Sequence, residues 1–279
     1  MPMTQGDIKA YYEEHWRSVE TSAQESMAYA NPVEVAVCEP IFEQFFEDCG
    51  IARGCRVMDI GCGSGRWIRF LHRVLCPKQL VGVDYASSSI GLMQETDLAS
   101  EAGVSFQVAD ITQQGLDIGQ RFDLVNIANV LFHIPEDDKF DSALVNLRRH
   151  LAPGGRVFLT DYLPRSTMRT EWMKVRSRYE WHRRLANAGL RIAGIRPICV
   201  FANDPMGIDG SDEGTRKHFD QVRTRVSQLG SASGNSEYRA FLRDTLVEIE
   251  NAILGFCEER IAPVDMPSQK LICLVPVRG

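Results

Sequence analysis

The sequence predicts an α/β domain in which a mostly parallel sheet is covered by helices on both faces. The first observation is a series of five short apolar runs, each as long as a strand, at residues 55–60, 79–84, 104–109, 121–128 and 155–161. The second is that each of the first four runs is followed by a segment that can form a helix or is at least long enough to cross over. Such alternation is typical of parallel strands joined by helices.

Two helices are predicted ahead of this alternation. Residues 4–18 are polar and aromatic, and we interpret them as a helix. Residues 32–49 follow Asn31, which can cap a helix, and they begin with a proline suited to the first helical position. Gly50 then marks the end of the second helix. We assign residues 1–50 to an N-terminal helical lid.

The C-terminal half adds a helix and two strands. Ser177 and the glutamate three residues later form a capping box, and the helix that they start ends at Gly189. Two further apolar runs, at residues 192–201 and 270–277, complete a sheet of seven strands.

The segment between those last two strands has helical spacing. Apolar residues recur at intervals of three and four over residues 219–229 and again over residues 238–256. We predict that residues 204–268 form an α-hairpin inserted before the last strand, as a lid or a dimer contact, because its apolar stripe must be buried. The sheet domain then comprises residues 51–203 and 269–279.

Composition excludes several classes of protein. The 279 residues carry a net charge of −6, which argues against a protein held on nucleic acid by its general charge. No apolar run reaches about 18 residues, so no membrane span is expected. The N-terminus lacks the basic-then-apolar order of a signal peptide. Eight cysteines without Cys-x-x-Cys spacing disfavour zinc and iron–sulfur sites, and we interpret them as buried free thiols in a reducing cytoplasm.

A glycine-rich turn follows the first predicted strand, where the chain reads VMDIGCGSG from Val57 to Gly65. Glycines at such a turn let the backbone approach a ligand closely and adopt positive φ angles. A dinucleotide-binding turn needs a glycine where Arg66 stands, and a phosphate-binding P-loop needs a lysine followed by serine or threonine. Neither pattern fits.

The turn resembles motif I of class I S-adenosylmethionine-dependent methyltransferases, and the other motifs of that family follow in order. Asp84 ends the second strand, 23 residues past Gly61, and Asp110 ends the third. The stretches at 122–134 and 151–157 resemble the fourth-strand motif and the turn that opens the fifth strand. The resemblance, which is to the small-molecule type (methyltransferase domain 11/12-like), implies a Rossmann-like sheet of strand order 3-2-1-4-5-7-6 and S-adenosylmethionine as cofactor.

The resemblance also implies a role for each site residue. Asp84 would accept hydrogen bonds from two ribose hydroxyls, Asp110 from the adenine amine, and Tyr85 and Ile111 would flank the adenine ring. The methionine end would lie near Asp59 and the turn. The implied cofactor-binding residues are Asp59, Gly61, Cys62, Gly63, Gly65, Asp84, Tyr85, Asp110, Ile111, Asn126 and Ala128, with Tyr12 and Trp16 from the N-terminal segment. The alternative for Asp84 and Asp110 is that they cap helices or turns. If Asp84 serves only the ligand, its removal should leave the fold intact.

Two segments are candidates for the acceptor site. Tyr11, Tyr12 and Trp16 close over the cofactor in one interpretation and pack as an ordinary amphipathic helix in the other. Residues 165–184 hold seven basic and two acidic side chains, a local charge of +5, together with Trp172. One hypothesis is an anionic or glycosidic acceptor, and the alternative is a solvated helix face.

The function predicted from these features is methyl transfer to a hydroxyl of a sugar or secondary metabolite. Alternatives are N- or C-methylation, or a catalytically silent subunit that binds cofactor. No metal is predicted, since the acidic groups of the metal-dependent type are missing after strands four and five, and a motif of nucleic-acid methylating enzymes is absent too. His133 is the leading base, ahead of Asp161 with Tyr162 and of His182.

Overall fold

The computed structural model describes residues 3–18, 32–199, 236–266 and 268–277, together with residues 217, 221 and 224. Within these ranges, none of the helices is long and apolar enough to cross a membrane.

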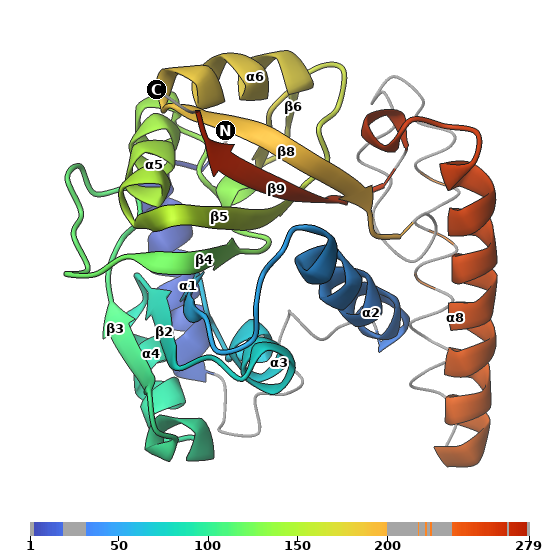
Figure 1. The fold of residues 1–279 in the computed structure, drawn as a ribbon, viewed down its shortest axis with the longest axis horizontal. Coiled ribbons are helices and arrows are strands. Elements are labelled where there is room, and N and C mark those ends of the chain that lie inside the picture. The colour runs from blue at the N-terminus through green and yellow to red at the C-terminus, as the bar shows by residue number, and fades with distance from the viewer. Residues whose placement is uncertain are drawn as a thin grey trace.

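One seven-stranded sheet forms the centre of the protein, in the order β3-β2-β1-β4-β5-β9-β8 (Figure 1). The first five of these strands pair in parallel, and β9 runs antiparallel to both β5 and β8. Its strands are β1 Arg56–Ile60, β2 Gln79–Asp84, β3 Val104–Val108, β4 Phe122–Ile127, β5 Leu151–Asp161, β8 Leu190–Pro197 and β9 Lys270–Pro276.

The strand order confirms the prediction. The labels differ from 3-2-1-4-5-7-6 because a separate two-stranded hairpin, β6 Met168–Arg169 and β7 Lys174–Val175, comes between β5 and β8 in the chain. The sequence analysis did not predict this hairpin, since two-residue strands are too short to give a pattern of alternation.

Helices cover both faces of the sheet (Figure 1). Val57 and Met58 are neighbours on β1, yet they belong to two different core clusters, because successive side chains of a strand point to opposite faces. α2 and α3 lie against the first face, and α5 and α6 against the second. The helices are α1 Gln5–Ser18, α2 Pro32–Asp48, α3 Arg66–Leu75, α4 Ser87–Gln94, α5 Asp137–Arg149, α6 Arg178–Asn187 and α8 Ser236–Glu258, with short 3-10 turns η3 Asp97–Ser100, η4 Leu131–His133 and η5 Pro263–Asp265.

Two predicted strand boundaries are wrong. β5 begins at Leu151 instead of residue 155, because Leu151 already pairs with Phe122 and an irregularity of register takes up the proline and glycines that follow. β8 covers Leu190–Pro197 instead of residues 192–201, because Gly189 has a φ of 68° and turns the chain from α6 directly into the strand.

The predicted insertion is described only in part. α8 corresponds to its second helix and contacts α2, with Glu250 and Leu254 buried. The first predicted helix, around residues 219–229, lies outside the described residues except for two single positions.

The predicted lid is also divided. α1 lies at the site described below, whereas α2 is a core helix whose Phe42 and Phe46 pack beneath the sheet. Of the two described helices of the 1–50 segment, α1 therefore has the position of a lid and α2 does not.

Candidate functional site

A cavity of about 580 Å³ lies at the carboxyl ends of β1, β2 and β4, between these strand ends and α1. Ligands of open α/β sheets bind at this edge, where the strand order reverses. Most of the predicted residues line it, namely Tyr12, Trp16, Gly61, Cys62, Gly63, Asp84, Tyr85, Asp110, Ile111, Ala128 and His133. The predicted residues Asp59, Gly65, Asn126 and Asp161 do not line it.

The glycine turn needs glycine for two physical reasons. Gly61, Gly63 and Gly65 all have φ between 49° and 78°, a range that residues other than glycine rarely adopt. A Cβ on Gly61 would lie 2.4 Å from a methyl group of Val130, and one on Gly63 would lie 2.9 Å from the ring of Trp16. The turn is thus packed tightly against Val130 at Gly61 and against Trp16 at Gly63.

Asp84 is a buried carboxylate that supports this turn. Its Oδ2 accepts a hydrogen bond from Gly63 N at 3.0 Å, and its Oδ1 accepts one from Ala86 N at 2.9 Å. Burial raises the pKa of Asp84. Because a carboxylate has about four lone-pair positions, two remain for ligand hydroxyls. The expectation that Asp84 serves only the ligand is therefore wrong, and its alternative role at a turn is real.

Asp110 already has a cationic partner. Its Oδ2 accepts from the Lys9 ammonium of α1, and its Oδ1 accepts from the Thr112 amide and hydroxyl at 2.9 and 2.7 Å. Burial alone would raise the pKa of Asp110, but these hydrogen bonds outweigh it and lower the pKa. Both oxygens of Asp110 therefore already accept hydrogen bonds from the protein.

Asp59 lies behind the turn rather than in the cavity. It is 1% exposed, and its Oδ1 accepts from Asn126 Nδ2 at 2.8 Å, while its Oδ2 has no hydrogen-bond partner. Burial raises the pKa of Asp59 to about 7. Asp59 and Asn126 therefore form one buried polar pair under the glycine turn.

α1 crosses the mouth of the cavity. Trp16 rests on Gly63, and the Glu13 carboxylate accepts from the Ser87 hydroxyl at 3.0 Å and the Ser88 amide at 3.3 Å. Tyr12 and Trp16 line the cavity, whereas Tyr11 packs on Trp172 outside its lining. Closure of these aromatics over the cofactor stays a prediction.

His133 has a defined orientation at the cavity wall. Its Nδ1 lies 3.3 Å from the Trp172 carbonyl oxygen, and its Nε2 lies 3.4 Å from the Tyr12 hydroxyl. Since a carbonyl oxygen can only accept, we assign the proton to Nδ1 and the lone pair to Nε2. Burial lowers the pKa of His133 to about 4, so the ring is neutral at pH 7.

The other candidate bases lie elsewhere. The Asp161 carboxylate is 1% exposed and accepts from the backbone amides of Tyr162 and Leu163 at 2.7 and 3.3 Å. Tyr162 is buried against Phe132, and His182 is exposed on α6. Asp161 serves its own turn, and we do not carry it into the chemistry.

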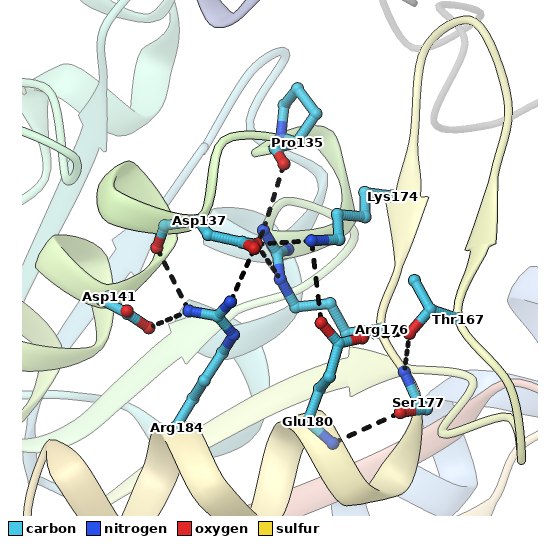
Figure 2. A network of polar contacts seen from close by, with 9 residues as sticks. All are labelled: Pro135, Asp137, Asp141, Thr167, Lys174, Arg176, Ser177, Glu180 and Arg184. Carbon is cyan, nitrogen blue, oxygen red and sulfur yellow. Dashed lines mark hydrogen bonds and ion pairs between the residues drawn. The ribbon is translucent and has the colours of Figure 1, made fainter.

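None of the seven basic side chains of the 165–184 stretch lines the cavity, although Met173 of the same stretch does. Lys174, Arg176 and Arg184 are almost fully buried and form ion pairs with Asp137 and Asp141 (Figure 2). Arg165 and Arg178 pair with Asp265, and the remaining two, Arg169 and Arg183, are exposed. The stretch is neither a solvated face nor an anion site: much of its charge is used inside the fold.

Three cavity residues that the sequence analysis did not assign to the site are Gln5, Arg66 and Met173. Lys9, which pairs with Asp110, was not assigned there either. Arg66 follows the glycine turn directly and is 6% exposed, so its position could have indicated a cavity residue. Gln5 is 6% exposed, and its side-chain oxygen has no hydrogen-bond partner. No sequence signal identified Gln5 or Met173, because only the tertiary fold brings them here.

These residues fit S-adenosylmethionine. The glycine cradle leaves no room for a Cβ, Asp84 retains lone pairs toward the cavity, and Asp110 stands where the third strand ends. The described residues contain no group of three or more His, Cys, Asp or Glu arranged to hold a metal ion.

Comparison with known proteins agrees with this fit. Residues 57–155 match the profile of a methyltransferase domain. The chain is 33% identical to a ubiquinone biosynthesis O-methyltransferase of Rhizobium johnstonii over 134 residues, 46% of this chain and 51% of that protein. It is 27% identical to phosphoethanolamine N-methyltransferase 1 of Zea mays over 120 residues, 43% of this chain and 23% of that protein. It spans about half the length of the ubiquinone enzyme and much less of longer relatives.

A solved structure has the same fold. N-methyltransferase NodS from Bradyrhizobium japonicum WM9, in complex with S-adenosyl-L-homocysteine, aligns over 68% of this chain and 90% of its own, with a TM-score of 0.53 and 18% identity. The fold and the cavity define an S-adenosylmethionine-binding domain. Residues 57–155 are thus similar to a methyltransferase domain, and the chain shares the fold of NodS.

Proposed function

We propose that this protein transfers a methyl group from S-adenosylmethionine to a hydroxyl of a small molecule such as a sugar or a secondary metabolite. The observation that carries the proposal is His133, whose Nε2 lone pair lies beside the Tyr12 hydroxyl in the same cavity as Asp84 and Asp110. The similarity to an O-methyltransferase supports oxygen as the methylated atom.

His133 acts as the base in this proposal. A hydroxyl with a pKa far above 7 must lose its proton as its oxygen gains the methyl group. Nε2 takes that proton, while Nδ1 keeps donating to the Trp172 carbonyl. With its pKa lowered to about 4 by burial, His133 is fully neutral at pH 7 but is a weaker base than an exposed histidine.

Tyr12 orients the acceptor. Burial raises the pKa of Tyr12 to about 12, so its hydroxyl stays protonated and can donate or accept a hydrogen bond beside Nε2. A substrate hydroxyl that is hydrogen-bonded to Tyr12 is thereby held close to His133 Nε2. Such positioning lowers the entropic cost of bringing the hydroxyl and the base together.

Different residues of the cavity would bind different parts of the cofactor. S-adenosylmethionine, when bound, supplies a methyl group on a positively charged sulfur. Asp84 would hold the ribose hydroxyls, Asp110 with Ile111 the adenine, and the turn from Gly61 the methionine end. This proposed reaction uses no metal.

Methylation of an amine is the second candidate, because phosphoethanolamine N-methyltransferase 1 of Zea mays is also similar to this chain. An amine acceptor needs no base, which would leave His133 without a role. A phosphorylated acceptor would also need cations. The buried basic residues of the 165–184 stretch are engaged with Asp137 and Asp141, whereas Arg66 lines the cavity. We favour an oxygen nucleophile over an amine or a carbon because it gives His133 a role.

The test uses the full chain with S-adenosylmethionine carrying a labelled methyl group, incubated with fractionated metabolite pools and analysed by mass spectrometry. We expect a labelled O-methyl product, at least about 100-fold less of it with His133→Ala, and unchanged yield with the exposed control His182→Ala. A labelled amine would favour the second candidate. Cofactor binding without any labelled product would favour a catalytically silent subunit.

Two further proposals concern the state of the protein. The exposed side chains of Phe241 and Phe256 on α8, 64% and 60% accessible, support a homodimer through this helix. The eight free cysteines support residence in a reducing cytoplasm, although Cys76 is exposed rather than buried. Sedimentation of wild type and of Phe241→Ser should differ, and equal monomer masses would contradict the dimer.

A further inference from the structure

A single carboxylate binds three cations behind the wall of the cavity (Figure 2). Asp137, at the start of α5, receives Lys174 Nζ at 2.5 Å and Arg176 Nη2 at 2.9 Å on Oδ1, and Arg184 Nη2 at 2.7 Å on Oδ2. Burial alone would raise the pKa of Asp137, but the hydrogen bonds and charges of these partners lower it to about 2. The carboxylate is therefore ionised at pH 7.

The three cations depend on this carboxylate because they are buried. The side chains of Arg176, Lys174 and Arg184 are 0%, 4% and 5% exposed. Arg184 has a second partner in Asp141 at 2.6 Å, and Lys174 reaches Glu180 only at 3.7 Å. A charge removed from water needs a partner with good geometry, so the cluster has one favourable arrangement.

The cluster joins the two chain segments that determine the orientation of His133. On one side, Asp137 lies four residues after His133, and the Pro135 carbonyl between them accepts from Arg176 at 3.4 Å. On the other side, Lys174 is the first residue of β7 and follows Trp172 by two residues. The Trp172 carbonyl oxygen accepts the hydrogen bond from His133 Nδ1. One ion-pair cluster thus fixes both the ring and its acceptor.

Besides the ion pairs, the β6–β7 hairpin is held by an apolar cluster, in which the fully buried Val175 packs with Phe132 and Tyr162. Backbone pairing adds little to the attachment of the hairpin. The hairpin is not part of the main sheet, and its two strands pair over only two residues each. Thr170 accepts from the amides of Trp172 and Met173 at 3.3 and 3.1 Å, which shapes the tip but does not anchor it. Two other contacts join this tip to the N-terminal segment. The ring of Tyr11 on α1 lies 4.5 Å from that of Trp172, and the amide of Met3, ahead of α1, donates to the Glu171 carbonyl.

We propose that Asp137 is a positioning residue for His133: it clamps the His133 segment to the β6–β7 hairpin, so that the Trp172 carbonyl holds the ring with its proton on Nδ1 and its lone pair toward the acceptor. The use of that lone pair as a base rests on the proposed function, whereas the clamp itself does not. Met173, which follows Trp172 and lines the cavity, is fixed by the same clamp.

The pKa and the tautomer of His133 report on the clamp, because few charged groups lie around the ring. The titratable group that contacts the ring is the Tyr12 hydroxyl of α1, and its neighbours Phe132 and Trp172 are uncharged. If the hairpin loosens, water reaches the ring and the Trp172 carbonyl no longer selects one tautomer. The pKa of His133 should then rise from about 4 toward the ordinary 6.5.

The experiment measures the ring nitrogens of His133 by nitrogen-15 NMR across a pH titration of the full chain. In wild type we expect the Nδ1–H tautomer alone. In Asp137→Asn we expect both tautomers and a pKa raised by more than about one unit, with rescue in Asp137→Glu. Affinity for S-adenosylhomocysteine should stay within threefold. The control is Asp265→Asn, which removes an equal charge from the exposed pairs with Arg178 and Arg165.

A second variant covers the case in which Asp137→Asn does not fold. Lys174→Met leaves Asp137 paired with both arginines and weakens only the attachment of the hairpin, so the same change in His133 is expected at smaller amplitude. An unchanged tautomer and pKa in a folded variant overturns the proposal. A parallel loss of S-adenosylhomocysteine affinity also overturns it, since the role would be general stability. A tautomer change with full activity in His133→Ala would leave the clamp standing and refute the proposed base.

Discussion

Replacing Asp84 by alanine should weaken both the fold and the binding of the cofactor. The carboxylate accepts from two backbone amides, those of Gly63 and Ala86. Hydrogen bonds to a charged group contribute about 1.5–3 kcal/mol each, so the two together set an upper value of about 3–6 kcal/mol. Because the turn borders a cavity that admits water to the freed amides, we expect a loss of about 2–4 kcal/mol in the free energy of unfolding.

The effect on the cofactor is separate from the effect on the fold. Asp84 has two lone-pair positions left for the ribose hydroxyls, and losing both bonds should weaken S-adenosylmethionine binding by at least about 100-fold. Asp84→Asn keeps one acceptor oxygen for one amide, so it should lose about half of the stability that alanine loses. It should still bind the cofactor poorly.

Urea unfolding and isothermal calorimetry separate the two effects. The matched control is Asp117→Ala, which removes an exposed carboxylate that accepts from one backbone amide, Gly119 N, in a turn away from the cavity. Wild-type stability in Asp84→Ala would refute the structural role of the carboxylate. Wild-type affinity for S-adenosylmethionine in the same variant would refute the assignment of the ribose site.

Two other predictions concern buried and half-buried charge. The native pKa of Asp59, about 7, lies above its unfolded value of 3.8, so the native state retains a proton that the unfolded chain releases. Stability should fall by up to about 4 kcal/mol as pH rises from 4 to 7, and Asp59→Asn should flatten that decline in urea titrations. An equal slope in both proteins would contradict the buried proton. Lys9→Met should change the free energy of unfolding by less than about 1 kcal/mol, because the pair with Asp110 is partly exposed. It should nevertheless speed cofactor binding and release, measured by the fluorescence of Trp16 in stopped flow, and unchanged rates would show that the pair does not hold α1 closed.

The sheet and its cofactor edge could be predicted from the chain because they depend on local patterns. Apolar runs of strand length, separated by crossover segments, determine a parallel sheet. Asp84 at the end of β2 and the glycine turn after β1 indicate a ligand site by their residue types. Carboxylates and glycines contribute little apolar surface to a core, so their place at strand ends needs another explanation. The capping box at Ser177 likewise determines the start of α6, and its side chain accepts from Glu180 N as predicted.

Tertiary structure decided what no local pattern contains. The basic stretch left open an anionic or glycosidic acceptor and a solvated face because sequence shows charge but not partners. Asp137, 37 residues before Lys174, pairs with three of its cations. The sequence shows only that residue 133 is a histidine, whose ordinary pKa is about 6.5, whereas burial lowers the pKa of His133 to about 4. Asp161 seemed a possible base, yet its own turn consumes its hydrogen bonds. Burial and long-range pairing set the charge and the acidity of a side chain, and both are properties of the packed molecule.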